Sequence, residues 1–293
     1  MLKIALVAPS ATFTHDELDQ ALLKASQESL IIVGGTQVRK ALPLFINGTK
    51  SERLLELAAA ENLNADTLWA VRGGCGAIDL WHDYDSLFYA HKKAPLIGYS
   101  DASILHFIRF YRAKRIGIHG PNFLEHAEEL STIKLLLEGR SGQISYPPLR
   151  KLNYFLPKVF KGELIIMNLI SLQSLVGSFE PSFLRGKILA LEETNEPMYK
   201  IYRALWQLKN SGALIGLKAL LIGHMPECRE RIIQEILVPL AEDLAIPLFD
   251  WPIFGHEKPN WPLLFGSHVV IRQVDEKLFT LSYTEESLDA QFI

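Results

Sequence analysis

Residues 95–102 read PLIGYSDA, a run that joins a short apolar strand to a helix through a sharp turn. Pro95–Ile97 is a strand candidate, and a helical pattern begins at Ser103-Ile104-Leu105. A serine at such an elbow projects its hydroxyl from the edge of a sheet, where the following backbone N–H can bind an oxyanion. The pattern G-x-S-x-A therefore makes Ser100 a candidate nucleophile. The same residues also fit a plain helix N-cap, because Ser and Asp commonly occupy that position.

The rest of the N-terminal half alternates short apolar runs with helical patterns. The predicted strands are Leu2–Val7, Ser29–Val33, Thr67–Val71, Pro95–Ile97 and Ile116–Ile118. The predicted helices are His15–Ser26 and Ser51–Glu61, the second with Ser51 as its N-cap. This alternation predicts a mainly parallel sheet covered by helices. Ligands of such sheets bind at the carboxyl ends of the strands.

A glycine-rich turn, Arg72-Gly-Gly-Cys-Gly76, follows the strand Thr67–Val71. Its glycines permit close approach of the backbone to an anion or oxyanion. The turn is neither a Walker A loop nor a G-x-G-x-x-G fingerprint, and a plain tight turn is the alternative. Cys75 is a rival nucleophile in principle, although a cysteine in this setting is more often a small packing residue.

The residue pattern changes between about Leu135 and Pro157, where Gly and Pro interrupt any helical periodicity. This segment is interpreted as a linker or a loosely strand-forming crossing. Regular patterns then resume. The predicted strands are Glu163–Met167, Lys187–Leu191, Ala219–Ile222 and Val269–Arg272, and the predicted helices are Met198–Asn210 and Arg229–Glu242.

The C-terminal half also contains candidates for a general base and for the acid that orients it. His256 lies in a loop rich in Gly, Pro and Trp, where a histidine is well placed for proton transfer. His119 and His224, which also follow strands, are alternatives. Glu192 and Glu193 end the strand Lys187–Leu191, the expected position for a triad acid. They could instead only lead into the next helix, and strand alternation would point them to opposite faces.

Composition limits the classes of function. A formal net charge of -3 provides no basic footprint for nucleic acid and no polybasic patch for a membrane. The apolar run Ile4–Ala8 is too short for a signal peptide, and the two cysteines do not make a disulfide scaffold, so the cytoplasm is expected. There is no H-E-x-x-H and no paired Cys/His spacing, so neither a metal nor another cofactor is expected.

Several short motifs together resemble the LD-carboxypeptidase family of serine peptidases. They occur in the family's order along nearly the whole chain, as follows: Ala8-Pro9-Ser10, Arg72-Gly73-Gly74-x-Gly76, Gly98-Tyr99-Ser100-Asp101, His119-Gly120-Pro121, Gly162 with Asn168-Leu169 and Gly177, Leu191-Glu192-Glu193 through Glu196-Pro197 to Tyr202-Arg203, and Phe254-Gly255-His256 with Pro259-Asn260.

The resemblance implies a role for each matching residue. Ser100 would be the nucleophile, His256 the base and Glu192 the orienting acid; alignment alone favours Glu192 over Glu193. The backbone amides of Gly74 and Asp101 would form the oxyanion hole. By its position, Arg72 is a candidate for binding the terminal carboxylate of the substrate, or it braces the glycine turn. The family usually has an aromatic residue where this chain has Cys75, which leaves the substrate preference open.

The resemblance also implies an α/β fold with two domains. Residues 1–135 would form a flavodoxin-like parallel-sheet domain carrying the nucleophile, and 136–161 a linker. Residues 162–293 would form a smaller α/β domain with a β-barrel-like sheet carrying the Glu and the His. The implied enzyme is a cytoplasmic, homodimeric carboxypeptidase that releases D-alanine from murein tetrapeptide in peptidoglycan recycling.

Two other functions remain open. The same scaffold could serve a self-immunity amide hydrolase that degrades a peptide–nucleotide antibiotic. Trp251 and Trp261 would then be candidates for stacking on a base. A non-catalytic binding module is the second alternative, although it would not need Ser100, Glu192 and His256 together.

Overall fold

The structure is a computed structural model that describes residues 1–35, 45–84, 94–153 and 159–284. The chain divides into two compact units. Among the described residues, the first comprises Met1–Leu136 and Pro262–Phe265, and the second comprises Leu137–Trp261 and 266–284. This division confirms the predicted α/β class with one open sheet and one barrel.

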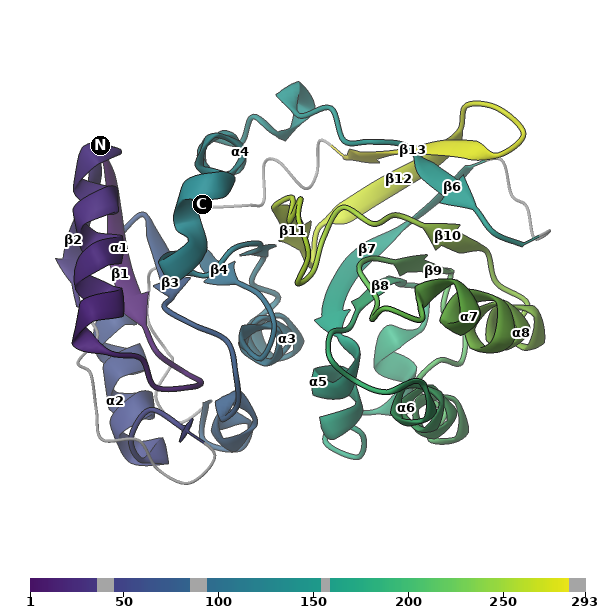
Figure 1. Ribbon diagram of the computed structural model, residues 1–293, viewed down its shortest axis with the longest axis horizontal. Coiled ribbons are helices and arrows are strands. Elements are labelled where there is room, and N and C mark those ends of the chain that lie inside the picture. The colour runs from purple at the N-terminus through teal and green to yellow at the C-terminus, as the bar shows by residue number, and fades with distance from the viewer. Residues whose placement is uncertain (36–44, 85–93, 154–158, 285–293) are drawn as a thin grey trace. The chain divides into compact units, whose positions relative to one another are not determined.

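The first unit contains a six-stranded sheet in the order β11-β5-β4-β3-β1-β2 (Figure 1). Its strands are β1 (Leu2–Val7), β2 (Leu30–Gly34), β3 (Thr67–Ala70), β4 (Leu96–Gly98), β5 (Gly117–His119) and β11 (Leu263–Phe265). All pairs are parallel except β11 with β5. The order 2-1-3-4-5 is that of flavodoxin-like folds, which confirms the predicted architecture. The carboxyl end of β4 leads directly to Ser100.

Helices pack along this sheet, with α1 against β2, α2 against β1 and α3 against β4 and β5. They are α1 (His15–Gln27), α2 (Lys50–Glu61), α3 (Ala102–Ala113) and α4 (Leu130–Leu137), with short 3₁₀ turns η2 (Ala77–Leu80) and η4 (Phe123–Glu128). The prediction that Ser51 caps the second helix was wrong. Thr49 is the N-cap, because its side chain accepts from the Glu52 amide while the Glu52 carboxylate accepts from the Thr49 amide.

The second unit is built on a closed barrel with strand order β10-β6-β13-β12-β7-β8-β9 (Figure 1). Its strands are β6 (Leu149–Lys151), β7 (Val159–Asn168), β8 (Ile188–Glu192), β9 (Ala219–Ile222), β10 (Leu248–Asp250), β12 (His268–Gln273) and β13 (Leu278–Tyr283). Strands β7, β8, β9 and β10 run parallel to one another. The sequence predicted β7, β8 and β9 because each contains a buried apolar run, which in β7 is confined to its second half.

Helices of the second unit connect these strands. They are η5 (Ser141–Gln143), α5 (Leu169–Ser174), η6 (Pro181–Leu184), α6 (Met198–Asn210), α7 (Arg229–Ile232), η7 (Ile233–Leu237) and α8 (Val238–Asp243). The single helix predicted at Arg229–Glu242 is continuous but changes to a π-turn at η7. Pro239 lacks the N–H that would bond the preceding turn, and a π-turn accommodates that loss.

The two units group some residues differently from the predicted domain ranges. Strand β6 lies inside the predicted linker 136–161 and pairs with β10 and β13 of the barrel, whereas 154–158 lie outside the described residues. Strand β11 lies inside the predicted C-terminal domain but pairs with β5 of the first sheet. Both are three-residue strands whose partners are distant in sequence, so local patterning does not reveal them.

Candidate active site

Ser100 lies in the turn between β4 and α3 with a backbone φ of 62°, in the left-handed region. A non-glycine residue rarely adopts this conformation, and when it does the strain is often functional. The turn continues directly into the helix, because the amide of Ser103 donates to the Ser100 carbonyl over 2.9 Å. The strained strand–turn–helix geometry is that of a nucleophile elbow, and it is more than a helix cap requires.

The Arg72–Gly76 turn packs against this elbow. A Cβ added to Gly73 would lie 2.8 Å from Ser100 Cβ and 3.0 Å from Ser100 Oγ, so no larger residue fits without displacing the serine. The backbone of the turn therefore comes close to the candidate nucleophile. This proximity is in line with the oxyanion role predicted for the Gly74 amide.

The Asp101 side chain is turned away from the helix that it begins. Its Oδ2 accepts from the amide of Ala77 over 2.9 Å, and the residue is only 7% exposed. Burial raises the pKa of this carboxyl from its ordinary 3.8 to about 6, although the bond from Ala77 and the nearby Arg53 oppose the shift. The Asp101 amide belongs to the first helical turn, whose N–H groups have no acceptor within a helix. Its role in binding an oxyanion stays a prediction.

Replacing Asp101 with asparagine should change how stability depends on pH. Because the pKa is raised in the folded state to about 6, folded Asp101 keeps a proton that the unfolded chain loses between about pH 4 and 6. The free energy of unfolding of the wild type should therefore fall across that window by about 3 kcal/mol relative to Asp101→Asn. Urea unfolding at pH 4 and pH 7.5 measures the difference.

A matched control is Asp275→Asn. Backbone hydrogen bonds from Lys277 and Leu278 lower the pKa of Asp275, so its substitution should shift the pH dependence in the opposite sense. A difference between Asp101→Asn and wild type that does not vary with pH would contradict the assignment for Asp101.

Arg72 forms an ion pair of 3.1 Å with Glu17, and both side chains are about half exposed. Glu17 also completes the capping box of α1 with Thr14. An exposed ion pair of this kind contributes little to stability, so Arg72 could exchange Glu17 for a substrate carboxylate at small cost. Its role in binding a substrate carboxylate stays a prediction.

Cys75 is a poor rival to Ser100. Burial raises the pKa of its thiol, and the nearby carboxylates of Asp101 and Asp79 act in the same direction. Since the thiolate is the reactive form, these surroundings keep Cys75 protonated and weakly nucleophilic.

Glu192 and His256 form a hydrogen-bonded pair in the second unit. Glu192 ends β8 and is fully buried, and its Oε2 lies 2.7 Å from Nδ1 of His256. A buried carboxylate bonded to Nδ1 orients an imidazole and leaves Nε2 as the nitrogen for proton transfer. This is the arrangement that the sequence predicts for the acid and base of a triad.

The neighbouring Glu193 has a different role. Its Oε1 accepts from the Asn168 side chain and the Thr194 amide, and its Oε2 accepts from the amide of Ile170 at the start of α5. Both oxygens are thus engaged in holding the ends of β7 and β8. Of the two carboxylates, Glu192 is the one that bonds His256 among the described residues, which agrees with the choice that alignment favours.

Gly255 allows the close contact between the His256 loop and Glu192. A Cβ at this position would lie 2.8 Å from Glu192 Oε2 and 2.9 Å from Glu192 Cβ, and the φ of Gly255 is +116°. Any side chain here would have to displace the carboxylate that orients His256.

Substituting Gly255 with alanine should therefore lower kcat by about 100-fold, since small misplacements of catalytic groups have effects of that size. Gly177→Ala is the matched control, because Gly177 also has a positive φ, +90°, but a Cβ there would meet nothing within 4 Å. Both variants should lose stability to backbone strain, by about 1–3 kcal/mol. Steady-state kinetics beside urea unfolding separates the effects, and an equal loss of kcat in both variants would contradict the proposed contact.

The other two candidate histidines, His119 and His224, do not bond Glu192 by any contact among the described residues. His119 is fully buried at the end of β5 in the first unit. His224 is buried after β9, and its two ring nitrogens contact backbone groups at Glu257 and Pro252. Ser100 with the Arg72–Gly76 turn thus belongs to one unit, and Glu192 with His256 to the other.

The aromatic residues of the second unit bear on the nucleobase alternative. Trp251 is fully buried, and its indole N–H donates to the Pro147 carbonyl over 2.8 Å, so it is a core residue and not a stacking platform. Trp261 is half-buried and meets the ring of Tyr146 edge-on at 5.7 Å.

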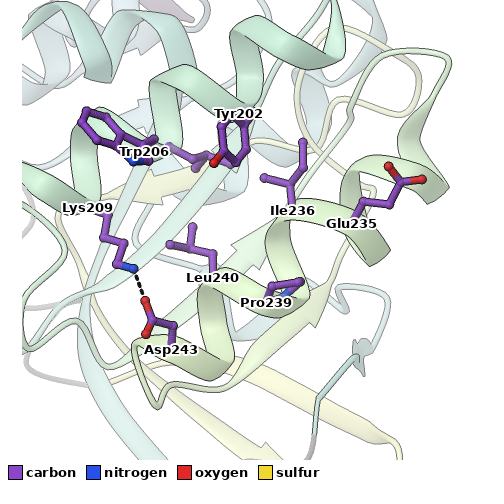
Figure 2. Close-up of a pocket in the computed structure, with 9 residues that line it drawn as sticks. Tyr202, Trp206, Lys209, Glu235, Ile236, Pro239, Leu240 and Asp243 are labelled. Carbon is purple, nitrogen blue, oxygen red and sulfur yellow. Dashed lines mark ion pairs between the residues drawn. The ribbon is translucent and has the colours of Figure 1, made fainter.

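A separate pocket with a volume of about 250 Å³ lies between α6 and the helical segment η7–α8. Figure 2 shows Tyr202 and Trp206 of α6 facing Ile236, Pro239 and Leu240, with an ion pair between Lys209 and Asp243. None of the candidate catalytic residues lines it.

Among the described residues, no three His, Cys, Asp or Glu side chains gather as they would around a metal ion. No helix in the described ranges is both long and apolar enough to cross a membrane.

Comparison with known proteins gives consistent matches. Residues 4–120 match the family model for the LD-carboxypeptidase N-terminal domain, and residues 161–271 match that for the C-terminal domain. The murein tetrapeptide carboxypeptidase of Pseudomonas aeruginosa is 28% identical over an alignment that covers 92% of each protein.

Solved structures show the same fold. The muramoyltetrapeptide carboxypeptidase of Oxalobacter formigenes matches with a TM-score of 0.78 and 22% identity, over 97% of this chain and 99% of the other. The microcin C7 self-immunity protein MccF, in complex with aspartyl sulfamoyl adenosine, matches with a TM-score of 0.74 and 18% identity over 96% of each chain. At these identities the structural matches establish the fold and no more.

Proposed function

The chain belongs to the LD-carboxypeptidase family, and on that premise we propose that it is a serine carboxypeptidase that releases the terminal D-alanine of murein tetrapeptide. One observation carries the proposal: the 2.7 Å hydrogen bond between the buried Glu192 and Nδ1 of His256. The choice of substrate is supported by the relative from Pseudomonas aeruginosa, which matches over nearly its whole length.

In the proposed mechanism, Ser100 Oγ attacks the carbonyl carbon of the L,D amide bond while Nε2 of His256 takes the hydroxyl proton. Glu192 holds the imidazole in the tautomer that has its proton on Nδ1, and it stabilises the imidazolium. The amides of Gly74 and Asp101 bind the oxyanion, a contribution of about 3–4 kcal/mol per donor in other hydrolases. His256 then gives its proton to the leaving amine of D-alanine, and water hydrolyses the acyl-enzyme.

An exopeptidase also needs a positive group for the terminal carboxylate of its substrate. We assign this role to Arg72, which lies next to the Gly73 turn that packs against Ser100 and forms an exposed ion pair with Glu17. The proposal further places the enzyme in the cytoplasm, as a homodimer that recycles peptidoglycan peptides.

The test is release of free D-alanine from the tetrapeptide L-Ala, D-Glu, meso-diaminopimelate, D-Ala. The matched control is the same peptide with L-alanine at its end, from which we expect no release. A peptide–nucleotide conjugate is the third substrate in the same assay. Cleavage of the conjugate but not of the tetrapeptide would overturn the proposal in favour of the self-immunity hydrolase. Cleavage of none of the three would favour a binding module or another amide substrate.

A further inference from the structure

His224 directly follows the β9–Gly223 segment and is only 4% exposed. The mechanism proposed above does not use it. Its backbone joins two parts of the second unit: its carbonyl accepts from the amide of Glu193 over 3.0 Å, and its amide donates to the carbonyl of Phe254 over 2.9 Å. His224 therefore links the end of β8, where Glu192 lies, to the loop that carries His256.

The imidazole of His224 makes two more contacts with that loop. The amide of Glu257 donates to Nδ1 over 3.1 Å, and Nε2 lies 3.1 Å from the Pro252 carbonyl. An amide N–H can only donate and a carbonyl can only accept, so these partners require a neutral ring with its proton on Nε2. The two ring nitrogens thus hold both sides of the loop, at Pro252 before His256 and at Glu257 immediately after it.

We propose that His224 is a positioning residue for the Glu192–His256 pair, an inference that rests on the proposed function. The 2.7 Å bond from Glu192 to His256 requires the β8 end and the 252–257 loop to keep a fixed separation. His224 bonds to both segments within one or two residues of the pair. Removing its ring would free the Glu257 amide and let His256 shift relative to Glu192, which lowers the fraction of the enzyme in the productive geometry.

Burial favours the neutral form of His224. It lowers the pKa of the ring, with a smaller contribution from Arg229, and it outweighs the opposing effects of the Glu257 and Glu192 carboxylates and of the bond to the Pro252 carbonyl. A protonated ring would present an N–H to the N–H of Glu257 and lose that bond.

The experiment compares His224→Leu and His224→Asn with wild type. Leucine removes both ring contacts, and we expect kcat to fall between about tenfold and 100-fold, with a smaller change in KM. The side-chain oxygen of asparagine is attached to Cγ, as Nδ1 of histidine is, and can accept from the Glu257 amide. His224→Asn should therefore recover most of the lost kcat.

Asn153→Leu is the matched control for stability. Asn153 is equally buried, 4% exposed, and its side chain likewise bonds two backbone groups, donating to the Ile246 carbonyl and accepting from the Leu248 amide. It contacts none of the candidate catalytic residues through these bonds. We expect this variant to lose stability as His224→Leu does, with kcat unchanged within about twofold at a temperature where all variants stay folded.

A second readout needs no substrate. The proton between His256 Nδ1 and Glu192 should give a downfield NMR resonance, assigned by its absence in His256→Asn. It should shift or broaden in His224→Leu and remain in Asn153→Leu. An unchanged resonance, or equal losses of kcat in His224→Leu and Asn153→Leu, would overturn the positioning role. Because the resonance is measured without substrate, it tests His224 even if D-alanine release fails.

Discussion

Replacement of Ser100 by alanine should reduce kcat for D-alanine release by about 10⁴-fold or more. The low rate that remains would come from substrate binding and the oxyanion donors alone. The reason is chemical: the substitution removes the hydroxyl that would form the acyl-enzyme, the adjacent Tyr99 side chain is buried, and burial raises the pKa of the neighbouring Cys75 thiol. Stability should change little, because Ser and Ala meet similar strain at the φ of 62°. Steady-state release of D-alanine, with the melting temperature alongside, measures both.

Ser103→Ala is the matched control for this variant. Ser103 is buried in the first turn of the same helix, and its hydroxyl has no hydrogen-bond partner among the described residues. We expect its kcat to stay within about threefold of wild type. D-alanine release that persists at the wild-type rate in Ser100→Ala would exclude Ser100 as the nucleophile. If adding Cys75→Ala then abolished that release, Cys75 would be the nucleophile.

Substitution of Glu192 by glutamine should lower kcat by about 10³–10⁴-fold. If the glutamine oxygen faces His256, the imidazolium loses its negative counter-charge. The amide nitrogen then occupies the position of Oε1, which is buried and has no hydrogen-bond partner among the described residues. If the amide nitrogen faces His256 instead, it forces the wrong imidazole tautomer. Either orientation leaves a poor base, so the loss should appear in kcat across the whole pH profile.

Glu193→Gln distinguishes the two adjacent carboxylates. Both oxygens of Glu193 accept hydrogen bonds, from Asn168, Thr194 and Ile170, and an amide nitrogen cannot replace an acceptor. We expect a loss of about 1–3 kcal/mol in the free energy of unfolding and a change in kcat below tenfold. The reverse pattern, with kcat lost in Glu193→Gln and retained in Glu192→Gln, would transfer the acid role to Glu193.

Most regular elements follow from local sequence because their signals are local. The buried strands β1, β3, β4, β8 and β9 are short apolar runs, and the amphipathic helix α6 has a clear helical period. The G-Y-S-D stretch predicts an elbow because its strand, turn and helix signals are adjacent in the sequence. Ser100, Glu192 and His256 were also selected as candidates from the sequence, with the help of family motifs.

The remaining features depend on contacts between distant segments. Closure of the barrel needs β6 to pair with β10 and β13, about 100 residues or more away, and no local pattern records such pairings. Strand β11 joins the first sheet for the same reason.

The sequence alone was sufficient to find the elbow serine, the α/β alternation and the pair of carboxylates, because each is encoded within a few residues. The different roles of Glu192 and Glu193, the fit of Gly255 against Glu192, and the links through His224 emerged only from the folded chain. In each case the orientation of a side chain is set by partners from other strands and loops, and a local sequence pattern carries no information about those partners.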